Sequence, residues 1–250
     1  MTTVNDIYEY IDSIAPFAAQ MGFDNSGLQL GRRSAEVKTA LLSLDVTDIV
    51  IDEAIRAGAQ LIISHHPLIF TAIKCVDDEK LLRLAENGIA VISAHTSLDI
   101  AEGGVNDVLI RLLGAEPECA LDAEGCGRIG ALPVAAEFDD FLHMCRDKLN
   151  TNGLRYYSAG KAVKRLAVMG GAGGDCVHDA FAAGCDTYVT ADIKYHQFLE
   201  AAELGLNLID GDHFCTEVPV MPVLFRRLSG AFPDVGFVLS RKHGQVVSFI

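Results

Sequence analysis

The residues with the clearest chemical potential are two adjacent histidines, His65 and His66, within LIISHHPLIF at residues 61–70. The apolar run before them is typical of a buried strand, and Pro67 ends regular strand geometry directly after them. Neighbouring side chains of a regular strand point to opposite sides, so two ions with one histidine each fit better than one shared ion. A lone histidine here would more often be a packed residue, so the inference depends on partners.

Two later segments supply partners with one shared spacing, His-x-x-x-acid, directly after an apolar run. IAVISAHTSLD holds His95 and Asp99, and LNLIDGDHFCTE holds His213 and Glu217. If the second segment begins a helix, His213 and Glu217 lie one turn apart and face the same point. Imidazole and carboxylate are usual ligands of zinc, iron and manganese, so the identity of the metal stays open.

The set predicts two divalent metal ions, because a carboxylate such as Glu217 can bridge two cations roughly 3.5–4 Å apart. Ligands also gather beyond the carboxyl ends of strands in open α/β sheets, where all of these residues are expected. The predicted metal ligands are His65, His66, Asp99, His213 and Glu217.

Two histidines are candidates for catalytic proton transfer, since an unperturbed imidazole titrates near pH 6.5. His95 is the first choice because it shares a loop with Asp99, and support of a metal ligand is its competing role. His196 is the second. It lies in TADIKYHQF, where Asp192, Lys194 and His196 either contact an anionic substrate or form a polar helix start.

Two glycine-containing loops have weaker signals. MGGAGGDC follows a strand and precedes a helix but lacks the third glycine of GxGxxG, so a tight turn is favoured over a dinucleotide site. FDNSGLQLG, at residues 23–31, either turns the chain or lines the site, and the turn is favoured.

The elements that must position these residues form an internal repeat. KTALLSLDVTDIVIDEAIRAGAQLIISHH resembles VKRLAVMGGAGGDCVHDAFAAGCDTYVTAD, with Gly58 opposite Gly184 and His66 opposite Asp192 at one constant offset. Each half alternates apolar, strand-length runs with helical segments closed by glycine, which indicates largely parallel sheets with helices on both faces. The expected strands are TALLSL, LIIS, IAVIS, RLAVM, TYVTA and LNLI.

We therefore expect the α/β fold class, with two similar three-layer α/β domains. The predicted domains are residues 1–125, which carry HHP and HTSLD, and residues 126–250, which carry TADIKYH and GDHFCTE. The boundary is placed near residues 125–130, where CALDAEGCG breaks the periodicity.

Composition narrows the classes of protein. A net charge of −14 disfavours nucleic-acid binding, which needs clustered Lys and Arg. No apolar run is long enough to span a membrane, and the N-terminus carries acids instead of a basic signal segment, so a cytoplasmic protein is expected. Seven cysteines without a CxxC pair suggest reduced thiols.

The motifs SHHPLIF, HTSLD followed by GGVND, TADIKYH and GDHFCTE, together with DNSGLQLG, resemble the NIF-three-like dinuclear-metal family, often named GTP cyclohydrolase 1 type 2. The resemblance covers nearly the full chain. It implies two divalent metals per subunit with Glu217 reaching both, a metal site in the interdomain cleft, and a ring-shaped homohexamer. Phe23 stands where the family usually has tryptophan, and Asp212 splits a glycine–histidine pair.

The expected function is a metal-dependent hydrolase of a small-molecule substrate. The resemblance makes it a GTP cyclohydrolase-type enzyme that opens the guanine imidazole ring of a nucleotide and releases formate. Two alternatives remain: a non-enzymatic metal carrier or regulatory scaffold, and a metal-dependent phosphoesterase that uses the same ions on another substrate.

Overall fold

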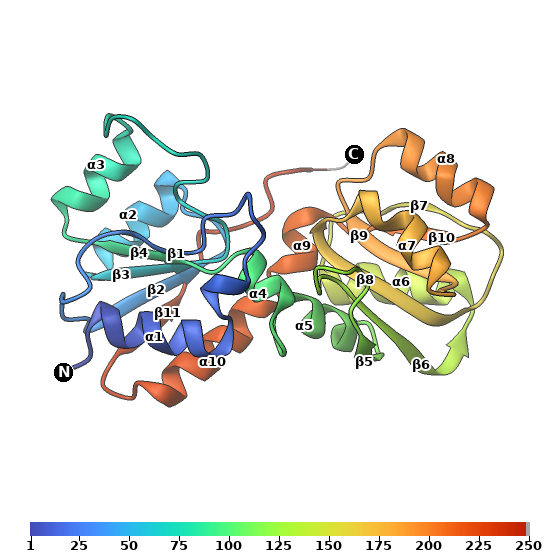
Figure 1. The fold of residues 1–250 in the computed structure, drawn as a ribbon, viewed down its shortest axis with the longest axis horizontal. Helices are drawn as coiled ribbons and strands as arrows, with labels where there is room; N and C mark the ends of the chain where they lie inside the picture. Colours follow the sequence, from blue (N-terminus) through green and yellow to red (C-terminus); the bar gives the residue numbers. More distant parts are fainter. Residues whose placement is uncertain (249–250) are drawn as a thin grey trace. The chain divides into compact units, whose positions relative to one another are not determined.

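The structure is a computed structural model that describes residues 1–248. Within this range the chain divides into two compact units (Figure 1). Unit 1 comprises Met1–Glu102 and Met221–Gly244, and unit 2 comprises Gly103–Val220 with the short segment from Gln245. No helix among residues 1–248 combines the length and the apolar character that crossing a membrane requires.

Unit 1 is built around a five-stranded sheet of order β1-β4-β3-β2-β11. Only β1 runs antiparallel to its neighbour, and the other strands are parallel. The strands are β1 (Gly27–Leu30), β2 (Thr39–Ser43), β3 (Leu61–Ser64), β4 (Ala90–Ser93) and β11 (Gly236–Leu239). The helices are α1 (Val4–Ile14), η1 (Phe17–Ala19), α2 (Asp48–Arg56), α3 (Glu79–Glu86), α4 (Thr96–Ile100) and α10 (Val220–Ala231).

Helices cover both faces of the unit 1 sheet, with α1 and α10 on one face and α2 and α3 on the other (Figure 1). Strand side chains alternate between faces, and on the α2/α3 face Leu41, Ile62 and Val91 form one buried cluster with Val50 and Leu84. The three-layer arrangement explains why LIIS and AVIS are apolar up to their final serines, since both of their faces are buried.

Unit 2 contains a six-stranded sheet of order β5-β6-β8-β9-β10-β7, in which β8, β9 and β10 are parallel. The strands are β5 (Glu116–Cys119), β6 (Arg128–Ala136), β7 (Arg155–Tyr157), β8 (Val163–Ala172), β9 (Thr187–Ala191) and β10 (Asn207–Asp210). The helices are α5 (Val105–Leu112), α6 (Phe138–Leu149), η2 (Gly174–Cys176), α7 (Val177–Ala182), α8 (Tyr195–Leu204) and α9 (His213–Glu217).

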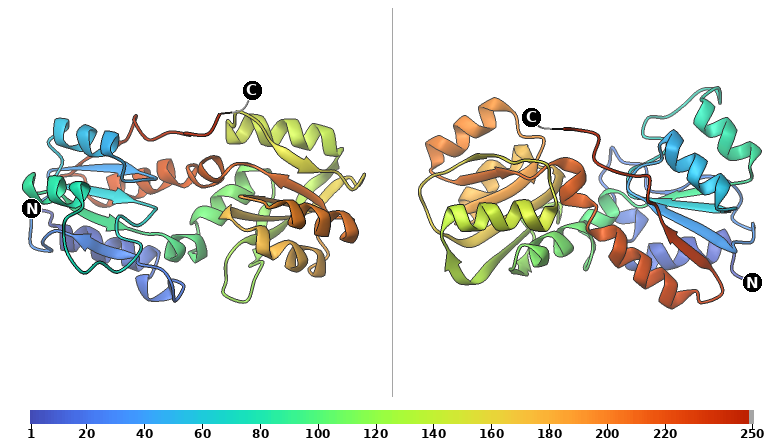
Figure 2. Two further views of the ribbon diagram at one scale, coloured as in Figure 1. Left: turned by 90° about the horizontal axis from the view of Figure 1, so that it is seen from above. Right: turned by 180° about the vertical axis from the view of Figure 1, so that it is seen from behind.

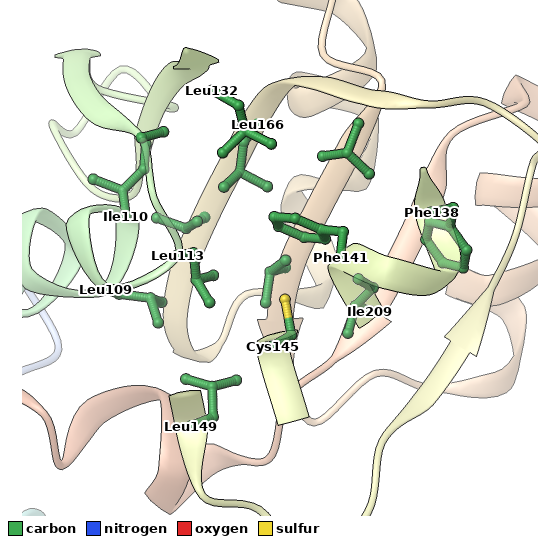
Figure 3. Packing of buried hydrophobic residues seen from close by; sticks show 14 of the residues in the cluster. Leu109, Ile110, Leu113, Leu132, Phe138, Phe141, Cys145, Leu149, Leu166 and Ile209 are labelled. Atoms are coloured by element: carbon green, nitrogen blue, oxygen red, sulfur yellow. The ribbon is translucent and has the colours of Figure 1, made fainter. Parts of the chain in front are cut away.

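The unit 2 core lies between the sheet and the pair of helices α5 and α6. Leu109 of α5 and Phe141 of α6 belong to one buried cluster with Leu166, Val189 and Ile209 from three parallel strands (Figure 3). Helices α7 and α8 cover the opposite face of this sheet (Figure 2). Unit 2 is therefore also a three-layer α/β structure.

The predicted repeat is present in the topology. The succession β2-α2-β3-α3-β4 in unit 1 corresponds to β8-α7-β9-α8-β10 in unit 2, and each contains three adjacent parallel strands. Gly58 and Gly184 end the first helix of each repeat with φ of +62° and +76°. Gln60 and Asp186 then accept hydrogen bonds from two backbone N–H groups at the start of β2 and β8, respectively. The prediction of two similar α/β domains is confirmed.

The limits of the two compact units differ from the predicted boundary at residues 125–130. CALDAEGCG is the turn between antiparallel β5 and β6, closed by a 3.0 Å hydrogen bond from Leu121 N to Cys126 O. Its glycines, Gly125 and Gly127, have positive φ, as a tight turn requires. The chain passes from unit 1 to unit 2 after Glu102 and returns at Met221, because β11 pairs with β2.

Candidate metal centre

Three of the predicted site histidines meet at the carboxyl ends of β3 and β4 in unit 1. His65 and His66 follow β3, and His95 follows β4 as the N-cap residue of α4. Each offers one ring nitrogen, and these three atoms lie within 4.8 Å of one another. Because β3 ends at Ser64, the His65 and His66 rings do not diverge as on a regular strand, and their centroids are 5.1 Å apart.

An oxygen acceptor holds Nδ1 of each of these imidazoles. The distances are 2.8 Å from His65 to the Ala94 carbonyl, 2.6 Å from His66 to Asp45 and 2.8 Å from His95 to Asp24. A carbonyl or carboxylate oxygen can only accept, so Nδ1 carries the proton, and in the neutral ring Nε2 carries the lone pair. This tautomer is the one in which Nε2 binds a metal.

The side chain of Asp24, the acceptor behind His95, is inaccessible to solvent. Burial by itself would raise its pKa, but hydrogen bonds from His95 and Thr96 outweigh burial and hold the pKa well below its usual range. Thr96 donates through both its hydroxyl (2.6 Å) and its backbone N–H (3.0 Å). Asp24 therefore fixes the first turn of α4 and the ring of His95 together.

Asp99, the predicted acidic ligand of unit 1, lies buried in α4. One of its carboxylate oxygens is 3.6 Å from Nε2 of His65. That separation exceeds a hydrogen bond, and it places a carboxylate oxygen and an imidazole lone pair around one point, as a shared cation requires. The donor set in unit 1 is thus suited to a divalent metal.

The second group of predicted ligands lies in unit 2, on the short helix α9. Nε2 of His213 is 3.2 Å from Glu217, one turn later, and its Nδ1 is 2.7 Å from Asp192. Burial by itself would lower the pKa of His213, but Glu217 and Asp192 outweigh burial and raise it to about 9. Without a metal, His213 is therefore a cation held between two carboxylates at neutral pH.

Gly171, in the MGGAGGDC segment, lets the backbone approach Glu217 closely. A Cβ placed on Gly171 would lie 2.2 Å from Oε1 of Glu217, and the φ of Gly171 is +67°. Its N–H donates to Thr216 Oγ1 at 3.0 Å, and the preceding N–H, of Gly170, donates to the buried Asn106 at 2.8 Å. The segment connects β8 to α7 through η2, and the preference for a turn over a dinucleotide site stays a prediction.

The residues of TADIKYH, the two candidate catalytic histidines and Asp212 have different surroundings in the structure. Asp192 contacts His213, whereas Lys194 is the N-cap of α8 and His196 is exposed on its first turn. His95 belongs to a cluster of potential ligands, and His196 belongs to none within residues 1–248. Asp212, which splits the glycine–histidine pair, caps α9 by accepting from Cys215 N at 3.1 Å.

The predicted turn at FDNSGLQLG is present at its start, where the Asp24 N–H donates to the Met21 carbonyl at 2.9 Å. The alternative, that the segment lines the site, has support as well. Asp24 contacts the His95 ring, and Ser26 accepts a 3.0 Å hydrogen bond from the His95 backbone N–H, so the segment lines the histidine group. Sequence reasoning also missed Asp45 as the partner of His66. An acid after a predicted strand is a signal for such partners, but it does not say which histidine the acid meets.

Comparisons with known proteins agree with this architecture. Residues 2–244 match the model of the family Duf34/NIF3 (NGG1p interacting factor 3). A Clostridium perfringens protein named "GTP cyclohydrolase 1 type 2 homolog" is 34% identical, with 99% of each chain covered, and a Methanocaldococcus jannaschii protein of the same name is also 34% identical, with 85% of this chain and 89% of that protein covered.

Two solved structures are similar over nearly the whole chain. "The Crystal Structure of Bacillus cereus protein related to NIF3" has a TM-score of 0.93 at 25% identity and covers 100% of this chain and 99% of that one. "Reduced HcgD from Methanocaldococcus jannaschii" has a TM-score of 0.85 at 31% identity and covers 95% and 97%. With the family match spanning almost all of its residues, this chain belongs to the Duf34/NIF3 family.

Proposed function

We propose that the protein is a dinuclear divalent-metal-dependent hydrolase of the GTP cyclohydrolase type, which opens the imidazole ring of guanine and releases formate. The names of its relatives support the reaction class, because several are "GTP cyclohydrolase 1 type 2 homolog". The metal part of the proposal rests on this chain's own side chains.

One observation carries the proposal. Each of the four imidazoles, His65, His66, His95 and His213, has its Nδ1 on an oxygen acceptor, three of them on carboxylates. Such acceptors orient metal-binding histidines and make them more basic. One histidine held in this way is a common packing feature, but three of them, His65, His66 and His213, beside buried Asp99 and Glu217 are better explained by metal binding. His95 is oriented in the same way but is proposed to move protons instead.

The proposed ligands are those predicted from the sequence. His65, His66 and Asp99 of unit 1 and His213 and Glu217 of unit 2 would together hold two ions, with Glu217 contributing to both. When bound, a pair of divalent cations supplies an activated water at neutral pH and polarises the bond under attack. Iron, zinc and manganese all suit these ligands.

Protein groups would then move the protons that ring opening requires. His95 is the first choice, because Asp24 fixes its tautomer and leaves Nε2 to accept a proton from water or return it to the leaving nitrogen. His196 is the second choice and is exposed to solvent. The ring-shaped homohexamer implied by the family resemblance belongs to the same proposal, and light scattering of the purified protein tests it.

The test combines metal analysis with product analysis. Untagged protein purified without chelators should hold close to two ions per chain, and Glu217→Ala should lose most of them. Glu203→Ala, on the exposed part of α8, is the matched control and should keep both ions. The metal-loaded wild type should release formate from GTP, and His95→Ala should slow this release while retaining metal.

The alternatives predict other products. Release of phosphate without formate from a panel of nucleotides would make the protein a phosphoesterase. Rapid reversible metal loss, with neither product from any nucleotide, would make it a carrier. Absence of bound metal in the wild type, even after anaerobic reconstitution, would contradict the metal centre itself.

A further inference from the structure

Two phenylalanines beside the unit 1 histidines have no role in the core. Phe23 is 63% exposed and Phe70 is 51% exposed, yet their ring centroids lie only 6.3 Å apart. The Phe70 ring also meets the His95 ring edge-on, with centroids 6.2 Å apart. The two rings therefore form an exposed aromatic pair next to the proposed proton-transfer residue.

The backbone that carries both rings is held in place by side-chain hydrogen bonds. Asn25 Nδ2 donates to the Ile69 carbonyl at 2.6 Å, and the Ile69 N–H donates to Gln29 Oε1 at 2.7 Å. Gln29 Nε2 in turn donates to the Asn25 carbonyl. DNSGLQ thus joins the segment of Phe23 to the segment of Phe70, although Phe23 and Phe70 themselves lie outside helices and strands.

Both phenylalanines also lie close in the sequence to residues of the histidine group or to residues that contact it. Phe23 directly precedes Asp24, whose carboxylate holds Nδ1 of His95, and Phe70 follows four residues after His66. Both rings therefore lie within a few residues of side chains that form or hold the histidine group.

The chemistry of the pair favours a flat aromatic ligand. Exposed aromatic rings offer π-faces on which the planar ring of a nucleobase stacks, and this stacking adds affinity beyond the apolar area that it buries. We propose that Phe23 and Phe70 bind the base of a purine nucleotide by stacking and so present its ring to His95. This inference rests on the proposed function for the choice of a purine, and it assigns the residues that select the base.

The test measures binding of three probes to the metal-loaded full-length protein by calorimetry: GTP, guanosine and inorganic triphosphate. Phe70→Leu and Phe23→Leu keep the apolar volume but remove the π-face, so each should weaken guanosine and GTP binding by about three- to ten-fold. Triphosphate has no base, and its affinity should not change. Phe70→Tyr keeps the ring and should bind like the wild type.

Phe181→Leu is the matched control, because Phe181 is 40% exposed on α7 in unit 2. It should leave all three affinities unchanged, and metal content should be equal in every variant. Equal guanosine affinity in wild type and both Leu variants would overturn the proposal, as would a wild type that binds no base. A change in molecular mass by light scattering, with affinities unchanged, would also overturn it and assign the rings to contact with a second copy.

The outcomes separate this inference from the proposed function. If no formate is released but the Leu variants weaken guanosine binding, the aromatic pair is a base-binding surface and the GTP cyclohydrolase reaction is wrong. If formate is released and neither Leu variant raises the KM for GTP, the reaction stands and the stacking role is wrong.

Discussion

At the scale of single residues, the acceptors behind the histidines are as informative as the histidines themselves. Asp24 accepts hydrogen bonds from His95, Thr96 and Ser26, with no accessible side-chain surface. A carboxylate has acceptor capacity for all of these donors, whereas an amide replaces one acceptor oxygen with a donor. Charge and acceptor count at this position are therefore both expected to matter for stability.

We predict that Asp24→Asn lowers the free energy of unfolding at pH 7 by about 2 kcal/mol, since hydrogen bonds to charged groups contribute about 1.5–3 kcal/mol each. Because the folded pKa of Asp24 is lowered, its stabilisation is present above the unfolded pKa of about 4 and is lost as pH falls through the folded value. Urea unfolding at pH 7 and pH 5 should show the same deficit. Asp77→Asn, in an exposed loop, is the control.

His213 makes the opposite prediction for pH. Its folded pKa, about 9, lies above the usual 6.5, so in the metal-free protein its stabilisation is present below pH 6.5 and lost as pH rises through 9. A metal must displace this proton, so metal affinity should rise between pH 6.5 and 9.

Titration of zinc into the metal-free protein, in buffers of different ionisation enthalpy, measures the protons released at pH 7. His213→Ala should release about one proton fewer than wild type. His143→Ala, exposed on α6, should release the same number as wild type. An equal count in wild type and His213→Ala would show that His213 is not protonated before the metal binds.

Sequence reasoning found the histidines and acids of the two groups because their chemistry and spacing are local properties. His213 and Glu217 are one turn apart wherever α9 lies, so their contact follows from the spacing. Asp24 and His95 are far apart in the chain, and nothing in FDNSG specifies that partner. The acceptors could be identified only once the strands had brought distant loops together.

At the scale of elements, β8 packs so closely against α9 that position 171 in the glycine segment has no room for a side chain. We predict that Gly171→Ala displaces Glu217, because the added Cβ would lie 2.2 Å from Oε1. Gly184→Ala is a matched control, since Gly184 also has a positive φ, +76°, but has open space around it. Backbone strain should lower the free energy of unfolding of both variants by about 1 kcal/mol. The decrease should be larger for Gly171→Ala, because its Cβ also displaces Glu217.

Only Gly171→Ala should also lose bound metal, measured by elemental analysis beside the wild type. Retention of metal in Gly171→Ala would mean that Glu217 can shift without leaving its ion. Loss of metal in both variants would instead point to a general loss of stability. The pair of variants thus separates backbone strain from displacement of the ligand.

The central parallel strands of each unit were predictable, whereas the edge strands and the antiparallel β6, Arg128–Ala136, were not. All six predicted strand runs lie in β2, β3, β4, β8, β9 and β10, because strands buried on both faces are apolar throughout. Edge strand β5 is largely exposed and contains Pro117, so it has no such pattern. The prediction also missed β11, whose residues alternate between exposed and half-buried positions.

At the scale of the whole molecule, the C-terminal segment completes the unit in which the chain began. β11 pairs with β2 in parallel. Phe232, which directly follows α10, contacts Tyr10 of α1 edge-on, with ring centroids 5.5 Å apart. Met221, Leu224 and Leu228 of α10 are buried. A boundary read along the sequence cannot detect such a return, because strand pairing between distant segments leaves no local signal.

This return predicts how fragments behave. Residues 1–125 alone should not unfold cooperatively, since they lack β11 and α10, and each buried Leu or Met side chain contributes about 1.5–3 kcal/mol. Loss of several such side chains is comparable to the whole stability of a domain, about 5–15 kcal/mol. Residues 103–220 contain every strand of the unit 2 sheet and should unfold cooperatively in urea. A cooperative transition of 1–125 would mean that unit 1 folds without its C-terminal strand and helix.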